Sequence, residues 1–101
     1  MIEQLQREAE PIIDRLCYEF GIKREEVIGD TRRHRVSTPR KLLMVILRRQ
    51  GWQLTEIGKF LNNRHHSTVI YGIKDIEKRL HDSVAMQNSL ERITLGVACG
   101  E

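Results

Sequence analysis

The sequence has few cysteines and no long run of apolar residues. Cys17 and Cys99 lie far apart and form no C-x-x-C pair, so a reduced, cytoplasmic setting is favoured over a secreted disulfide scaffold. The longest apolar run, Leu42 to Leu47, is far shorter than the roughly 20 residues that cross a bilayer. Acidic side chains recur through residues 1–20, which argues against a signal peptide. We therefore expect a cytoplasmic protein that neither spans nor contacts a membrane.

The sequence also lacks the common signatures of catalysis and cofactor binding. It contains no G-x-x-x-x-G-K-[ST] phosphate loop, and no Ser-His-Asp or Cys-His arrangement can be assembled from it with any specificity. The adjacent pair His65-His66 is a poor metal site, because consecutive helical residues point about 100° apart and no cysteine or carboxylate lies nearby at ligand spacing. We expect no enzyme activity, no metal, no nucleotide and no other cofactor.

Acidic residues are missing from residues 31–50, and this absence makes the charge distribution uneven. Residues 1–30 carry four basic and eight acidic residues, and residues 51–101 carry six of each. The basic residues of 31–50 are Arg32, Arg33, Arg35, Arg40, Lys41, Arg48 and Arg49. A localised basic patch orients an anionic ligand on one face, whereas a general coat for polyanions would be more evenly charged. At 101 residues the chain has room for one core, so we expect a single domain over residues 1–101 that binds nucleic acid.

The apolar periodicity predicts an all-α protein, a small helical bundle without strands. Pro11 predicts a kink or break in the first helix, because an interior proline costs about 3 kcal/mol. Thr38 and Pro39 are typical of a helix start, since threonine can cap the free amides and proline needs no partner there. Val84, Leu90 and Ile93 are expected to pack the last helix onto the bundle. The predicted helices are about 2–20, 23–28, 39–50, 54–61, 65–80 and 83–95, with a basic loop over 30–38 and a frayed tail from residue 96.

Residues 54–80 have the pattern of a helix-turn-helix, in which a short helix and a tight turn precede a longer amphipathic helix. In the longer helix one side is apolar (Val69, Ile73, Ile76 and Leu80), and the opposite side is polar and cationic (Ser67, Tyr71, Lys74 and Lys78). Gly58 leaves space for a close helix crossing, and Asn62-Asn63 tolerates the positive φ angles of a tight turn. An ordinary helical hairpin would also explain these glycine and asparagine positions.

A set of spaced residues extends through both helices of this motif and upstream of it. It comprises Glu56-Ile57-Gly58, Arg64 to Val69, Ile73-Lys74 and Ile76-Glu77, preceded by Val36 and Pro39-Arg40. This pattern resembles the signature of the C-terminal DNA-binding domain of the bacterial replication initiator DnaA. The resemblance covers about residues 11–95, and a pattern spaced over three helices is much more specific than a short motif.

The resemblance implies a monomeric protein that binds double-stranded DNA at a short, asymmetric, A/T-containing sequence, the DnaA box. The second motif helix would enter the major groove, and the basic loop would enter the adjacent minor groove. The implied major-groove residues are Arg64, His65, His66, Ser67 and Thr68. The implied minor-groove residues are Arg32, Arg33, His34 and Arg35, and the implied phosphate contacts are Arg40, Lys41, Leu54 and Thr55. Such a protein would be associated with the nucleoid and act in replication-initiation control or transcription regulation.

This sequence departs from the family pattern at three places. His65 occupies a position that is usually aspartate, and histidine can donate to guanine O6 or a purine N7, whereas aspartate accepts from cytosine N4. We therefore expect an altered base preference at this position. Asn62-Asn63 replaces the usual paired glycines, and the loop arginines are offset by one, which leaves His34 where arginine is common.

Two interpretations from different classes follow from these residues. The first is a stand-alone DnaA-like protein that lacks the ATPase and competes for the initiator's sites or regulates transcription there. The second is a helical adaptor that binds a protein partner and retains only weak or vestigial DNA affinity. Salt dependence distinguishes the two, because a protein that engages about five phosphates has a log–log slope of roughly −4.5. An adaptor should show no such salt dependence.

Overall fold

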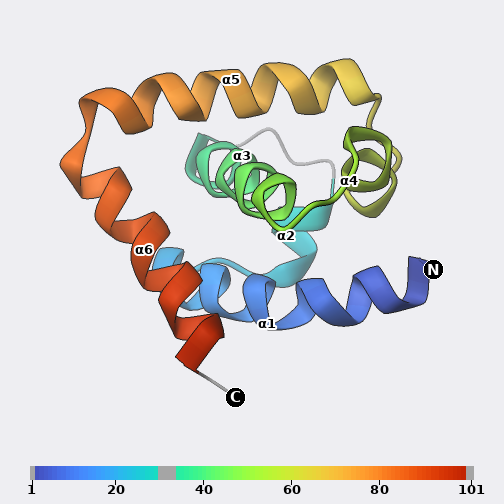
Figure 1. Ribbon diagram of the computed structural model, residues 1–101, viewed down its shortest axis with the longest axis horizontal. Helices are drawn as coiled ribbons and strands as arrows, with labels where there is room; N and C mark the ends of the chain where they lie inside the picture. The colour runs from blue at the N-terminus through green and yellow to red at the C-terminus, as the bar shows by residue number, and fades with distance from the viewer. Residues whose placement is uncertain (1, 30–33, 100–101) are drawn as a thin grey trace.

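The computed structural model describes the backbone of residues 2–29 and 34–99, and the side chains of residues 7–29 and 35–94. Within the described backbone there are six α-helices and no strand (Figure 1). They are α1 (Ile2–Phe20), α2 (Arg24–Ile28), α3 (His34–Arg49), α4 (Leu54–Phe60), α5 (His66–Asp82) and α6 (Val84–Cys99). The predicted all-α fold is confirmed.

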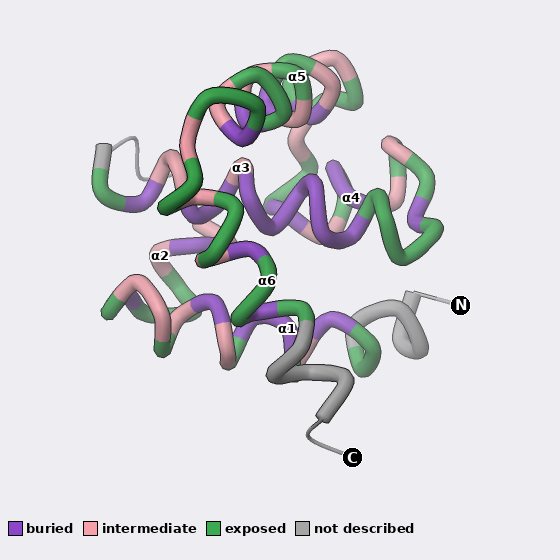
Figure 2. The backbone as a smooth tube through the Cα atoms, turned by 60° about the vertical axis from the view of Figure 1, so that its left-hand side comes forward, coloured by how far each residue is buried: buried purple, intermediate pink, exposed green. Residues whose placement is uncertain are grey.

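Helix α3 forms the centre of the bundle. It lies between α1 and α5 (Figure 1), and every residue from Leu42 to Leu47 is at most 2% exposed. Figure 2 shows that this middle part of α3 is buried, whereas exposed and buried positions alternate along α5. A run of six apolar residues is too wide for a one-sided helix, and the surrounding helices explain it.

Helix α1 continues through Pro11, so the predicted break at this residue does not occur. Pro11 itself is exposed, and solvent can therefore hydrate the Arg7 carbonyl that has no amide partner at position 11. Ala9 and Ile12 are buried on either side of the proline. Their packing against the core holds both halves of the helix in place.

Helix α3 begins at His34 rather than at Pro39, so the predicted start was five residues too late. Val36 is fully buried, and its packing draws the first turn into the helix despite the proline that follows. Thr38 does not act as the predicted cap, because its Oγ1 accepts a hydrogen bond from Arg79 Nη1 of α5 at 2.9 Å. Tertiary contacts have overridden a local start signal.

The turn between α4 and α5 has the backbone that its sequence predicts. Asn62 and Asn63 have φ values of 61° and 55°. The turn folds back closely onto α4, where the Arg64 amide donates to the Gly58 carbonyl at 2.8 Å. Gly58 therefore provides space for the backbone of the turn, whereas the sequence had suggested space for a crossing helix.

Helix α3 is connected to α4 through a turn at Gly51. Gly51 adopts a φ of 98°, which is the left-handed conformation expected of a helix stop. Trp52 is buried and meets Phe60 edge to face at 5.6 Å between ring centroids. Trp52 is therefore part of the core.

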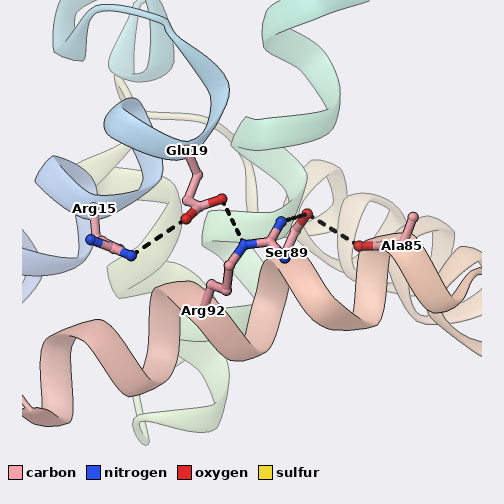
Figure 3. A network of polar contacts seen from close by, with 5 residues as sticks. All are labelled: Arg15, Glu19, Ala85, Ser89 and Arg92. Carbon is pink, nitrogen blue, oxygen red and sulfur yellow. Dashed lines mark hydrogen bonds and ion pairs between the residues drawn. The ribbon is translucent and has the colours of Figure 1, made fainter.

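Helix α6 closes the bundle by packing against α1. Figure 3 shows Glu19 of α1 between Arg15 of the same helix and Arg92 of α6, and Arg92 Nε donates to Glu19 Oε2 at 3.0 Å. Leu90 and Ile93 are buried as predicted, but Val84 is 69% exposed. Met86 packs against the core in its place, because residues 86, 90 and 93 share one helical face.

The end of α6 differs from its prediction, since the helix extends through Cys99 instead of ending near residue 95. Across the described residues, no helix has both the length and the apolar character needed to cross a membrane.

Candidate nucleic-acid interface

Helix α5 presents one polar face to solvent and one apolar face to the core. Its buried residues are Val69, Gly72, Ile76 and Leu80, and Ile73 is partly buried against the same core. Thr68, Tyr71, Lys74 and Lys78 are exposed, and Ser67 is half-buried. Gly72 lets α5 approach α3 closely, because a Cβ at this position would lie 2.7 Å from Met44 Sδ. The predicted division of the helix into two faces is confirmed.

The first turn of α5 is capped by His65. His65 Nδ1 accepts the backbone amide of Ser67 at 3.2 Å and lies 2.8 Å from Ser67 Oγ. The ring of His65 also lies against that of His66, with centroids 4.2 Å apart and a tilt of 33°. Both histidines are exposed, so these contacts order an accessible pair of rings at the start of the helix.

A cleft of about 320 Å³ lies beside this first turn, between α4 and α5. It is lined by Arg48, Gln53, Leu54, Thr55 and His66. The structure therefore brings together three predicted site residues, His66, Leu54 and Thr55. It adds Arg48, which sequence reasoning had noted only as part of the basic run.

A second cleft, of about 640 Å³, flanks the opposite side of the turn, between α3 and α5. Its lining residues are Ser37, Arg40, Lys41, Met44, Arg64, Thr68 and Gly72. Four predicted site residues, Arg40, Lys41, Arg64 and Thr68, thus share one hollow. Three of them are cations, so the hollow is strongly basic.

The Arg40 side chain is directed into the protein. Arg40 is 6% exposed, and its Nε and Nη2 atoms donate to the carbonyls of Val27 and Glu26, each at 2.6 Å. Both acceptors belong to the last turn of α2. In this conformation the guanidinium holds backbone oxygens, whereas the sequence had predicted a phosphate contact.

Arg64 binds the same end of α2 from the other side. Its Nη2 donates to the Gly29 carbonyl at 2.7 Å, and its Nη1 donates to the carbonyls of Leu61 at 2.7 Å and Ile28 at 3.3 Å. The sequence had predicted a base contact for this arginine. The structure instead places its guanidinium between the turn and α2.

The two arginines together neutralise the carboxyl end of α2. This helix has no basic residue in its last turn, although the carbonyls at a helix C-terminus carry partial negative charge. Residues 26–29 each contribute a carbonyl to Arg40 or Arg64. The absence of a basic residue in the last turn of α2 is the sequence signal that could have indicated partners from elsewhere.

Lys41 takes part in an ion-pair network between α3 and α5. Its Nζ lies 2.9 Å from Asp75 Oδ2, and Arg79 Nη2 lies 3.1 Å from the same oxygen. The hydrogen bond from Lys41 is the largest cause of an Asp75 pKa below its ordinary value of 3.8. Lys41 therefore remains at the rim of the basic hollow with an acidic partner.

We expect this network to lose its stabilising effect in acid. Because the pKa of Asp75 is lower in the folded protein, the contribution is full above about pH 4 and is lost as the pH falls through the folded pKa. An Asp75→Asn variant should therefore show a shallower fall in the free energy of unfolding, measured by urea titration between about pH 6 and pH 2. Part of the pH dependence of the free energy of unfolding should remain in both proteins, because the pKa of Glu10 is also lowered, by a hydrogen bond from Arg24. Equal slopes would contradict the prediction.

The predicted minor-groove loop is only partly described. Arg32 and Arg33 lie outside the described residues, as does the side chain of His34. Arg35 belongs to the first turn of α3 and pairs with Glu26, with Nη2 2.6 Å from Oε2. The part of the predicted loop from residue 34 onward is therefore helical.

No metal centre is found within the part of the chain that the structure describes. No three side chains among its histidines, cysteines, aspartates and glutamates gather in a way that could hold an ion. The His65-His66 pair accordingly has no third ligand among these residues.

Comparison with known proteins identifies clear relatives. Residues 9–76 match the family model described as the bacterial dnaA protein helix-turn-helix. The chain is 36% identical over 95 residues to the chromosomal replication initiator protein DnaA of Thermus thermophilus, covering 91% of this chain and 21% of that protein. It is 32% identical over 81 residues to the DnaA of Lachnoclostridium phytofermentans, covering 79% and 18%. The chain thus spans only about a fifth of the length of these curated relatives.

Proposed function

This chain belongs to the bacterial DnaA helix-turn-helix family, and on that basis we propose that it binds double-stranded DNA sequence-specifically at DnaA-box-like sites. The observation that carries the proposal is the exposed first turn of α5, which is capped by His65 and flanked by a basic cleft on one side and by a cleft that contains Arg48 on the other. A helix that presents its N-terminal residues from a rigid bundle suits entry into the major groove.

In this proposal the residues divide into three kinds of contact. His65, His66, Ser67 and Thr68 approach base edges, because they occupy the cap and first turn of α5. Lys41 and Arg48, together with the backbone around Leu54 and Thr55, hold phosphates on either side of that turn. Arg32, Arg33, His34 and Arg35 follow the adjacent minor groove, where arginine favours narrow A/T sequences.

Arg40 and Arg64 have a different role in this proposal. Their guanidiniums are occupied by the carbonyls at the end of α2, so we assign them to positioning. They hold the start of α5 and the end of α2 at a set distance from each other. The major-groove and minor-groove contacts are thereby kept in register.

We further propose that the domain acts as a monomer on DNA, without nucleotide and without catalysis, on the nucleoid in the cytoplasm. The relatives are named as chromosomal replication initiators, which supports a role in replication-initiation control or in transcription regulation at the same sites. The residues proposed to read bases all lie at the start of α5, so a single copy suffices for an asymmetric site.

A fluorescence-anisotropy titration with a DnaA-box duplex and a scrambled duplex tests the function. We expect box-selective binding with a log–log salt slope near −4.5 if about five phosphates are engaged. Thr68→Ala should weaken box binding by roughly five- to tenfold, because one hydrogen bond to a base edge is lost. Alanine is a good helix former, so α5 should remain folded.

Thr94→Ala provides the matched control, since Thr94 is exposed on α6 and its Oγ1 bonds only its own helix, to the Leu90 carbonyl at 2.9 Å. It should bind the box as the wild type does. Equal affinity of the wild type for both duplexes would contradict sequence-specific binding. Affinity without salt dependence would favour the protein-binding adaptor instead.

A further inference from the structure

The cap of α5 determines which nitrogen of His65 carries the proton. The Ser67 backbone amide lies 3.2 Å from His65 Nδ1, and an amide N–H can only donate. Nδ1 must therefore accept, and in the neutral imidazole the proton resides on Nε2. The Ser67 hydroxyl, 2.8 Å from the same Nδ1, can rotate to donate as well. Both contacts stabilise the same tautomer.

The protonated nitrogen faces away from the helix. In an imidazole ring Nε2 lies across the ring from Nδ1, so a ring whose Nδ1 points back at the first turn directs Nε2 outward. His65 is exposed, and its ring is held against that of His66 at 4.2 Å. The outward group is therefore an oriented N–H donor.

A donor at this position selects against several bases. In the major groove cytosine presents the N4 donor, which opposes an N–H. Adenine presents N7, which can accept the N–H, but its N6 donor lies directly beside it. Thymine has a single O4 acceptor beside a methyl group. Guanine presents N7 and O6 as adjacent acceptors and no donor, and it is the base most compatible with an outward Nε2–H.

We propose that His65 is a specificity-determining residue that selects guanine at one position of the DNA site through Nε2–H. This inference rests on the proposed DNA-binding function. It goes further by specifying that His65 is the donor in one hydrogen bond to a base, which follows from the geometry of the α5 cap in this chain.

Selection from a library of randomised duplexes tests the inference with the full chain. The wild type should enrich guanine at one position, with roughly five- to tenfold preference over cytosine. His65→Asp should shift that position to cytosine on the same strand, because a carboxylate only accepts. His65→Ser should remove the preference there, because serine is too short to reach the base.

Aspartate and serine are both good cap residues, so neither variant is expected to unfold α5. The other positions of the site should therefore keep their preferences in both variants. This pattern separates a base contact from a merely structural role, since loss of the cap alone would weaken binding to every sequence.

A second measurement checks the tautomer without DNA. The ¹⁵N chemical shifts of the His65 ring in the free protein should show a protonated Nε2 and a bare Nδ1. A protonated Nδ1 in the neutral ring would overturn the inference. It would also be overturned if the position whose base preference changes in the His65 variants is one at which the wild type prefers a base other than guanine.

The outcomes also separate this inference from the function on which it rests. If the wild type enriches a site and no position changes in either variant, the role of His65 is refuted and DNA binding stands. If the wild type enriches no sequence at all, sequence-specific binding is refuted, and the role of His65 is refuted with it.

Discussion

Replacing Arg64 by alanine is expected to lower the free energy of unfolding by about 3 kcal/mol, because the three carbonyls that its guanidinium holds lose a charged donor. In a domain of this size the midpoint of thermal unfolding should fall by roughly 12–24 °C. The free energy of unfolding of Arg64→Lys should lie between those of the wild type and Arg64→Ala, since a lysine ammonium cannot match the fork geometry of a guanidinium. Urea and thermal titrations measure both effects.

The same variant should lose selectivity between the box and the scrambled duplex, measured at a temperature where it remains folded. Arg64 precedes the cap of α5 by one residue, so its removal frees the start of this helix relative to α2. Arg92→Ala is the matched control, because the Arg92 guanidinium also donates to more than one acceptor, Glu19 and Ser89, but joins α6 to α1. It should reduce stability and leave selectivity unchanged.

A different result would restore the role predicted from sequence. If Arg64→Ala weakens binding to every duplex equally and reduces the magnitude of the salt slope by about one, the guanidinium contacts a phosphate. If stability and selectivity are both unchanged, the contacts with the end of α2 do not position α5.

Gly58→Ala is expected to reduce the free energy of unfolding by about 3 kcal/mol. A Cβ at Gly58 would lie 2.1 Å from the Arg64 carbonyl oxygen, and this oxygen belongs to backbone that cannot rotate away. The Arg64 amide is also bonded to the Gly58 carbonyl, so relief of the clash requires the turn to move. Urea titration at neutral pH measures the loss.

Gly72→Ala is the matched control, because it is also a buried glycine within a helix. Its Cβ would meet Met44 Sδ at 2.7 Å, but a methionine side chain can move. The gain in helix propensity, about 1 kcal/mol, offsets part of the remaining cost. If Gly58→Ala reduces the free energy of unfolding no more than Gly72→Ala does, the close-approach explanation is contradicted.

The elements that burial defines were predictable from sequence. The apolar spacing of α5 identified its core face, because this spacing depends on which side chains avoid water. Asn62 and Asn63 indicated their backbone conformation for an equally local reason, since few other side chains tolerate positive φ.

What the sequence did not reveal depends on partners distant along the chain. Pro39 indicated a helix start, but the buried side chain of Val36 extended α3 toward the N-terminus. The family resemblance predicted a phosphate contact for Arg40 and a major-groove contact for Arg64. Their partners are backbone carbonyls, which every residue possesses, so no pattern of residue types distinguishes these acceptors.

The contact between α1 and α6 makes folding depend on two helices that are distant along the chain. Glu19 and Arg92 are bonded across 73 positions of sequence, and Leu90 and Ile93 complete the cluster that contains Ile13 and Leu16. A nascent chain therefore carries an uncovered apolar face on α1 until α6 has left the ribosome. We expect the bundle to close only after α6 has emerged from the ribosome.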